Sequence, residues 1–172
     1  MSQFIQRVSL VVCFVLVVST HSFSQKNPRA TAKLEQDGKF VMIEYGRPSL
    51  KGRDMLEMAE IGKVWRMGAD KSTTLTSDST ITFGKVSIPQ GSYSLWLKKL
   101  AENSFELVFN KATGQWGTQH EAIQDFASVP MVLSEGTESV EVFTIRLGKA
   151  SKGGSVELLW GKTILRAHFA LK

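Results

Sequence analysis

From residue 31 to its end, the chain alternates apolar and polar residues with a period of two in one segment after another. Successive side chains of a β-strand point to opposite faces, so this pattern indicates strands with one buried face. In the second half it predicts these inward-facing residues: Tyr93, Leu95, Leu97; Phe105, Leu107, Phe109; Phe143, Ile145, Leu147; Val156, Leu158, Trp160; Leu165, Ala167, Phe169, Leu171. Earlier strands are expected over 31–36, 39–45, 72–77 and 80–88.

Turn residues separate these segments, which favours antiparallel pairing. The sharpest signal is Asp37-Gly38, a preferred pair for a two-residue hairpin. About eight to ten short strands at this spacing predict an all-β fold, a single antiparallel β-sandwich that is jelly-roll-like or barrel-like. One short helical turn is expected near residues 54–60, where Met55 and Met58 have helical spacing.

The N-terminus has the parts of a secretory signal peptide. Arg7 supplies the positive charge, and the apolar run 8–18 is shorter than the roughly 18 residues that a spanning helix needs. Small residues follow, so cleavage is expected after Ser24. This predicts a signal peptide over 1–24 and one domain over 25–172, periplasmic or secreted, with no stable membrane span after cleavage. A short N-terminal anchor is the alternative.

Composition narrows the chemistry further. Cys13, inside the apolar run, is the only cysteine, so the exported domain would have no disulfide, thiol nucleophile or thiolate metal site. The 21 Lys and Arg against 16 Asp and Glu give a net charge of +5, with both signs interleaved, which argues against nucleic acid as a partner. His120 and His168 have no neighbouring histidine at metal-ligand spacing, so we expect no metal and no cofactor.

The segment EYGRPSLKGR, residues 44–53, is unusual for a surface connection because it combines two arginines with a proline and two glycines. Pro48 favours an extended Arg47, and Gly52 permits a positive-φ turn just before Arg53. A guanidinium held in a set direction can make two-bond contacts with a carboxylate or a phosphate. The segment therefore indicates a rigid, basic loop.

Trp65 and Arg66 follow shortly afterwards, and Trp116 stands beside a glycine. With Arg47 and Arg53 they predict a recess of the size of an anion or a sugar, for an anionic small molecule or a glycan. In the alternative, the arginines bind strand-end carbonyls and nearby carboxylates, while Trp65 fills the open end of the sandwich. We favour the architectural role, because structural ion-pair networks resemble binding sites closely.

Catalytic patterns are mostly missing. The sequence has no Gly-x-Ser-x-Gly motif. His120 with Glu121 or Asp125 is a weak candidate for a general acid–base pair of a hydrolase. A structural or protein-interaction domain is a further alternative, in which the segment around the outward-facing Trp96 would meet a partner.

The order of several motifs resembles a known bacterial family. EYGRPSLKGR, then GKVWRMGADKSTT, then IPQGSYSL, followed by Asn110 and the QWG around Trp116, is similar to the domain of unknown function DUF 2911 over about residues 28–160. The resemblance implies an exported, β-rich envelope domain and no established activity, and it adds Asn110 to the candidate ligand contacts. Gln90 departs from the family, which usually has Ala in this turn. We therefore expect a non-catalytic binding or accessory module, with the hydrolase and the structural domain as alternatives.

Overall fold

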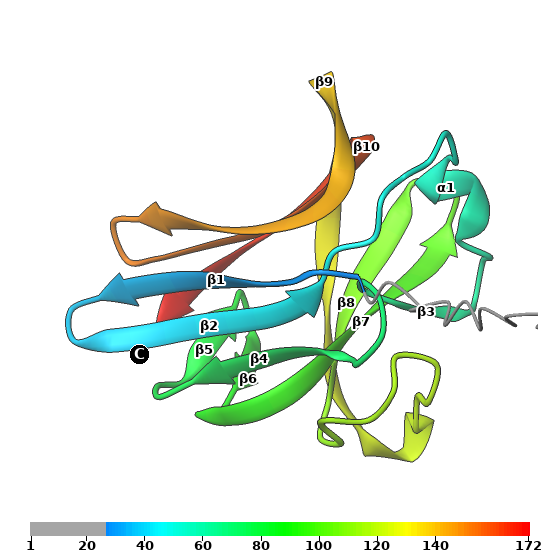
Figure 1. The fold of residues 1–172 in the computed structure, drawn as a ribbon. Helices are drawn as coiled ribbons and strands as arrows, with labels where there is room; N and C mark the ends of the chain where they lie inside the picture. The colour runs from blue at the N-terminus through cyan, green and yellow to red at the C-terminus, as the bar shows by residue number, and fades with distance from the viewer. Residues whose placement is uncertain (1–26) are drawn as a thin grey trace, which may run out of the picture.

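The computed structural model describes residues 27–172, which form ten strands, one α-helical turn and one 3₁₀ turn (Figure 1). The strands are β1 (Arg29–Gln36), β2 (Lys39–Gly46), β3 (Val64–Arg66), β4 (Thr73–Ser77), β5 (Ile81–Phe83), β6 (Val86–Ile88), β7 (Gly91–Ala101), β8 (Ser104–Asn110), β9 (Asp125–Ala150) and β10 (Gly153–Leu171). The helical turns are α1 (Met55–Met58) and η1 (Ala122–Gln124). The predicted signal peptide lies outside the described residues, and within 27–172 no helix is long and apolar enough to cross a membrane.

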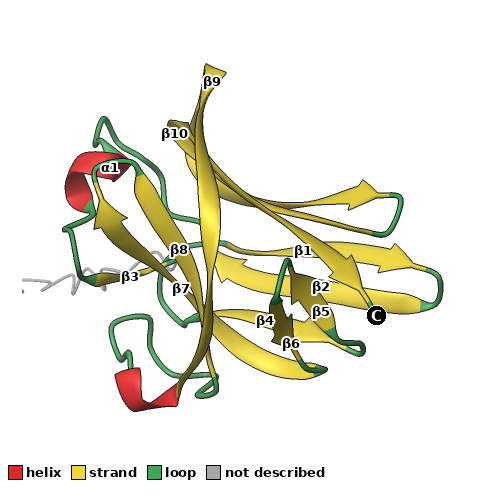
Figure 2. Cartoon of the chain, turned by 180° about the vertical axis from the view of Figure 1, so that it is seen from behind, coloured by secondary structure: helices red, strands yellow, loops and turns green. Residues whose placement is uncertain are grey.

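All strand pairs are antiparallel, in the order β1-β2-β4-β7-β8-β9-β10-β5-β6, with β3 beside β7. The long strand β9 connects two layers: residues 125–131 pair with β8, and most of the remainder pairs with β10. Figure 2 shows β9 running along the height of the molecule. Aromatic rings then meet between the layers, Tyr45 of β2 with Phe143 of β9 and Phe83 of β5 with Phe109 of β8. The predicted all-β antiparallel fold is confirmed.

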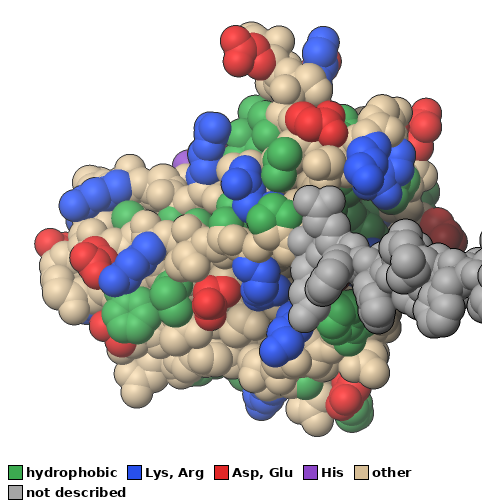
Figure 3. All heavy atoms as spheres, in the orientation of Figure 1, with side chains coloured by type: hydrophobic (Ala, Val, Ile, Leu, Met, Phe, Trp, Pro, Cys, Tyr) green, Lys and Arg blue, Asp and Glu red, His purple; other side chains and the backbone are tan. Residues whose placement is uncertain are grey.

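The core consists of the side chains that the alternation placed inward. Leu95, Leu97, Leu107, Phe109 and Phe143 are all at most 1 % exposed. The outer surface carries charged side chains of both signs, as the face in Figure 3 shows. Stability therefore depends on burial of these apolar side chains between the two layers.

The predicted tight turn at Asp37-Gly38 is confirmed. Both residues have positive φ, 53° and 74°, and Gln36 pairs with Lys39 across the hairpin. The predicted helical turn is confirmed as α1, which is a single turn. Segment 80–88 differs from the expectation, because Gly84 with φ 57° turns it into the hairpin β5–β6 instead of one strand.

The predicted exposure of Trp96 is wrong. Strand β7 lies inside the sheet, between β8 on one edge and β3 and β4 on the other, so it offers no free edge. Trp96 does point away from the sandwich core, but it is only 2 % exposed because the ring of His120 packs on it at 4.8 Å between centroids. Its indole N–H donates to the buried Ser94 Oγ at 2.9 Å. His168 of β10 is exposed.

Candidate functional site

Three glycines lie where the sequence motifs cross one another. A Cβ on Gly46 would lie 2.1 Å from the carbonyl oxygen of Ala69, and a Cβ on Gly68 would lie 2.6 Å from that of Gly46. A Cβ on Gly117 would lie 2.9 Å from the carbonyl oxygen of Asp70. The same oxygen accepts a hydrogen bond from the Gly117 N–H at 2.7 Å. Segments 44–53, 62–74 and 115–117 thus pack backbone against backbone, which only glycine allows.

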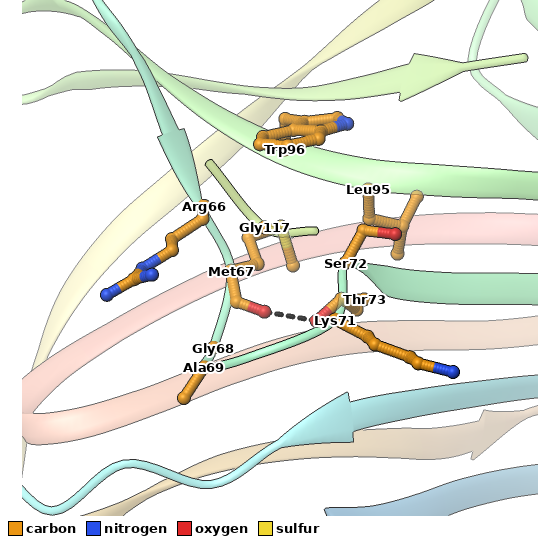
Figure 4. A pocket seen from close by; sticks show the side chains of 10 residues that line it. All are labelled: Arg66, Met67, Gly68, Ala69, Lys71, Ser72, Thr73, Leu95, Trp96 and Gly117. Carbon is orange, nitrogen blue, oxygen red and sulfur yellow. Dashed lines mark hydrogen bonds between the residues drawn. The ribbon is translucent and has the colours of Figure 1, made fainter. Parts of the chain in front are cut away.

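Close to this crossing, Arg66, Lys71 and Gly117 surround a space too small for a water molecule (Figure 4). The hydroxyl of Thr73 donates to the carbonyl oxygen of Met67 and ties the turn together. The junction is therefore solid packing and not a recess.

Arg47 acts as a clamp on β9. Its Nε donates to the Phe143 carbonyl at 3.3 Å and its Nη2 donates to Thr144 Oγ1 at 3.2 Å. Its backbone N–H donates to the Pro28 carbonyl at 2.8 Å. The half-buried guanidinium is occupied by protein acceptors, which is the architectural role expected for the basic loop.

The residues after Arg47 form backbone hydrogen bonds with β9. The β9–β10 ladder shifts register on both sides of Gly161, and β9 bulges there. Leu50 N–H donates to the Glu141 carbonyl at 2.7 Å, and Phe143 N–H donates to the Pro48 carbonyl at 2.9 Å. The proline-containing segment thus supplies the backbone partners that the bulge removes from the ladder.

Arg53, in contrast, faces solvent. Lys51 and Gly52, with φ 52° and 71°, form a tight turn in which Arg53 N–H donates to the Leu50 carbonyl at 3.2 Å. The Arg53 Nε donates to the same carbonyl at 2.9 Å, and its Nη2 donates to the Ser49 carbonyl at 2.7 Å. The guanidinium carbon lies 5.7 Å from the ring centroid of Trp160. Backbone and aromatic contacts together hold this cation in one direction.

Trp65 and Arg66 are separated by the geometry of β3. Neighbouring strand residues point to opposite faces, so Trp65 turns inward beside Leu97 and Arg66 turns outward beside Trp96. Trp65 stacks on Trp160 at 5.9 Å with an interplanar angle of 25°. It fills the end of the sandwich, while Arg66 is exposed next to Trp116-Gly117.

A cleft of about 960 Å³ lies at Arg53. It is lined by the turn at Leu50, Arg53 and Asp54, by Asn103 of the β7–β8 turn, by residues 131–135 and Ser139 of β9, and by residues 160–163 of β10. Its volume is within the range of about 300–1,000 Å³ that is usual for small-molecule sites. The lining combines aliphatic side chains with hydroxyl and amide groups, so the cleft can accept an amphipathic ligand.

Two ionisable side chains of the cleft pair with each other. Lys162 Nζ lies 3.7 Å from Glu135 Oε1, with the side chains 60 % and 76 % exposed. Such an exposed and long contact is weak. Of the two cations that line the cleft, Arg53 is therefore the one that protein contacts hold in a fixed direction, whereas Lys162 is held only by this weak contact.

Asn110 and His120 belong to a separate cluster. Asn110, fully buried, donates from Nδ2 to the Glu121 carbonyl and to Asp125 Oδ1, both at 2.8 Å, and accepts the Ala112 N–H at 2.9 Å. The same Asp125 oxygen lies 2.8 Å from His120 Nε2. The cluster fastens the loop that covers Trp96. Asn110 is thus not in contact with the Arg53 cleft.

The structure therefore divides the candidate residues. Arg53 borders the cleft, Arg66 and Trp116 are exposed outside it, and Arg47, Trp65 and Asn110 are engaged inside the fold. The β9 and β10 residues of the cleft were missed, because no local pattern marks a cleft between strands far apart in sequence.

The family model for a protein of unknown function, DUF2911, matches residues 27–169. The chain belongs to this family. Neither a curated protein nor a solved structure matches it. Membership in DUF2911 agrees with the resemblance of the motifs and assigns no activity.

Proposed function

We propose that this DUF2911 protein is an exported, non-catalytic binding module whose ligand site is the Arg53 cleft. The observation that carries the proposal is the direction of Arg53. Two backbone carbonyls and the Trp160 ring hold its guanidinium at the wall of a cleft of about 960 Å³. A preoriented guanidinium loses little entropy on binding and can donate two hydrogen bonds to a carboxylate or a phosphate.

The rest of the lining favours a small, hydroxyl-rich ligand. Asn103, Ser134, Ser139 and Thr163 offer amide and hydroxyl groups, while aliphatic side chains such as Leu133 offer apolar contact. A saccharide with an acidic substituent has both kinds of surface. The ligand class we propose is therefore an anionic sugar-sized molecule bound through Arg53.

Calorimetric titration tests this proposal with digalacturonate and glucose 6-phosphate as acidic probes and maltose as the neutral one. We expect the acidic probes to bind at least about tenfold more tightly than maltose. Arg53→Ala should weaken the binding of the acidic probes by about tenfold or more, since hydrogen bonds to charged groups contribute about 1.5–3 kcal/mol. Arg146→Ala, an exposed arginine of β9 outside the cleft lining, is the matched control. If the Arg53→Ala variant bound the acidic probes as tightly as the wild type, the Arg53 cleft would not be their binding site.

Export is a separate part of the proposal, supported by the arrangement of Arg7, the apolar run 8–18 and Ser24 in the sequence. Expression in a bacterium followed by fractionation and intact-mass measurement tests it. We expect a periplasmic or released product that begins at Gln25. A full-length product that stays in the cytoplasm would contradict export.

A hydrolase is the second candidate, because His120 Nε2 lies 2.8 Å from Asp125 Oδ1. The pair resembles a general base with its orienting carboxylate. However, Asn110 and Trp96 engage the same two side chains in packing the covering loop. A hydrolase would lose its turnover in His120→Ala, whereas the binding module retains its affinity for digalacturonate in this variant.

A further inference from the structure

A second surface, lined by none of the cleft residues, combines exposed cations with an exposed tryptophan. It consists of Arg29, Arg66, Lys71 and Trp116, and we call it the basic face. Arg29 Nη1 donates to the Lys71 carbonyl at 3.3 Å, and Lys71 forms an isolated antiparallel bridge with Trp116. Gly117, next to Trp116, lies against Arg66, since a Cβ there would be 3.4 Å from Arg66 Cδ. These contacts bring together residues from three parts of the chain: β1, segment 62–74 and segment 115–117.

The charges of the basic face are not neutralised within residues 27–172. Arg29, Arg66 and Lys71 are exposed and enter no ion pair among the described side chains. Asp70, the acidic neighbour of Lys71, is half-buried and accepts the Asn27 N–H at 3.2 Å. Three cations therefore stand beside one engaged carboxylate, although the whole sequence has a net charge of only +5.

The shape of the basic face excludes a small enclosed ligand. The space between Arg66, Lys71 and Gly117 is closed, and the side chains of Arg66 and Lys71 extend away from each other (Figure 4). Trp116 is 47 % exposed and makes no ring contact within the described part of the chain. Cations that extend away from each other, with an exposed tryptophan bridged to one of them, suit an extended anionic surface better than one small anion.

We propose that the basic face binds the surface of a membrane rich in anionic phospholipid. Arg and Lys side chains attract lipid phosphates, and an exposed tryptophan is the residue that prefers the boundary between headgroups and acyl chains. The position of Asn27, bonded to Asp70, places the start of the described chain beside the same surface. None of the residues of the basic face lines the Arg53 cleft.

Vesicle flotation of the full chain tests the proposal, with vesicles of phosphatidylcholine alone and with about one third phosphatidylglycerol. We expect a higher partition into the anionic vesicles that disappears near 1 M salt, where the screening length falls to about 3 Å. Arg66→Ala and Lys71→Ala should each lower the anionic partition about fivefold, and Trp116→Ala should lower it as well. Arg7 beside the apolar run 8–18 also attracts anionic lipid, so the deciding comparison is between the variants and the wild type in anionic vesicles, where the N-terminal segment is the same.

Arg146→Ala and Lys152→Ala are matched controls, because they remove exposed charges outside the basic face and should leave flotation unchanged. Equal partition into both vesicle types, or an equal loss in the controls, would overturn the proposal. So would binding to a sulfated polysaccharide that depends on Arg66 while vesicle binding does not. Arg53→Ala should float normally, so failure of the cleft and failure of the basic face remain distinguishable.

Discussion

At the scale of single residues, chemically identical side chains have different tasks. Arg47 and Arg53 stand six positions apart in one segment, yet the guanidinium of Arg47 is turned toward β9 and that of Arg53 toward the cleft. The difference follows from the turn at Lys51-Gly52, which reverses the chain between them. Residue type predicted a basic loop correctly, but the direction of each side chain depends on β9, which is distant in sequence.

Asn110 should be a large single contributor to stability. Its side chain is fully buried and makes three hydrogen bonds, so Asn110→Ala leaves the Glu121 carbonyl and the Ala112 N–H without their partner. We expect the free energy of unfolding to fall by about 2–3 kcal/mol in urea denaturation. Asn103→Ala, an exposed asparagine in the β7–β8 turn, should change it by less than about 0.5 kcal/mol. Similar losses in the two variants would contradict this role.

Tyr93 should make the protein sensitive to alkali. Burial raises the pKa of Tyr93 above its ordinary value of 10.0, so the folded state holds this proton more tightly than the unfolded chain. The resulting stabilisation is complete below that value and is lost as the pH rises through the folded pKa. Thermal melts of the wild type and of Tyr93→Phe measure this: the decline in melting temperature above pH 10 should be smaller in the variant. Parallel curves would show that Tyr93 does not contribute.

At the scale of elements, the crossing of segments 44–53 and 62–74 is the tightest contact between motifs. Gly46→Ala would bring a Cβ to 2.1 Å from the Ala69 carbonyl oxygen, so the backbones must separate. We expect a loss of about 3 kcal/mol or more in urea denaturation, as in strong overpacking. Gly62→Ala is the control, because Gly62 has φ 83° and open space around it, and should cost only about 1–2 kcal/mol. A Gly46→Ala variant as stable as Gly62→Ala would refute the close crossing.

Local patterns predicted most elements but not their extent. Alternation identified the inner faces of β7, β8 and β10 because each buries one face against the other layer. It missed residues 125–138 of β9, where Pro130 and Gly136 interrupt the strand signal. Pro130 is tolerated because β9 has a ladder partner on only one side there, namely β8. The long strands β9 and β10 thus replace the short ones expected.

At the scale of the whole molecule, the site could be predicted only in part. The order of the motifs indicated the family and a basic loop, and Arg53 does border the cleft. The other walls come from the bend in β9 and β10, which depends on how one sheet folds over itself. Trp65 and Arg66 are adjacent in sequence but lie on opposite faces of β3, so their pairing as one surface does not occur.

Arg47 is engaged inside the fold, whereas Arg53, which two backbone carbonyls orient at the cleft, is proposed to bind the ligand through its remaining donors. Urea denaturation and digalacturonate titration of Arg47→Ala and Arg53→Ala test this assignment most directly. For Arg47→Ala we predict a loss of about 1–3 kcal/mol in the free energy of unfolding and unchanged affinity. For Arg53→Ala we predict a change of less than about 1 kcal/mol in the free energy of unfolding. We predict that its affinity for digalacturonate falls by about tenfold or more. The opposite assignment, with Arg53→Ala unstable and still binding digalacturonate, would contradict the account.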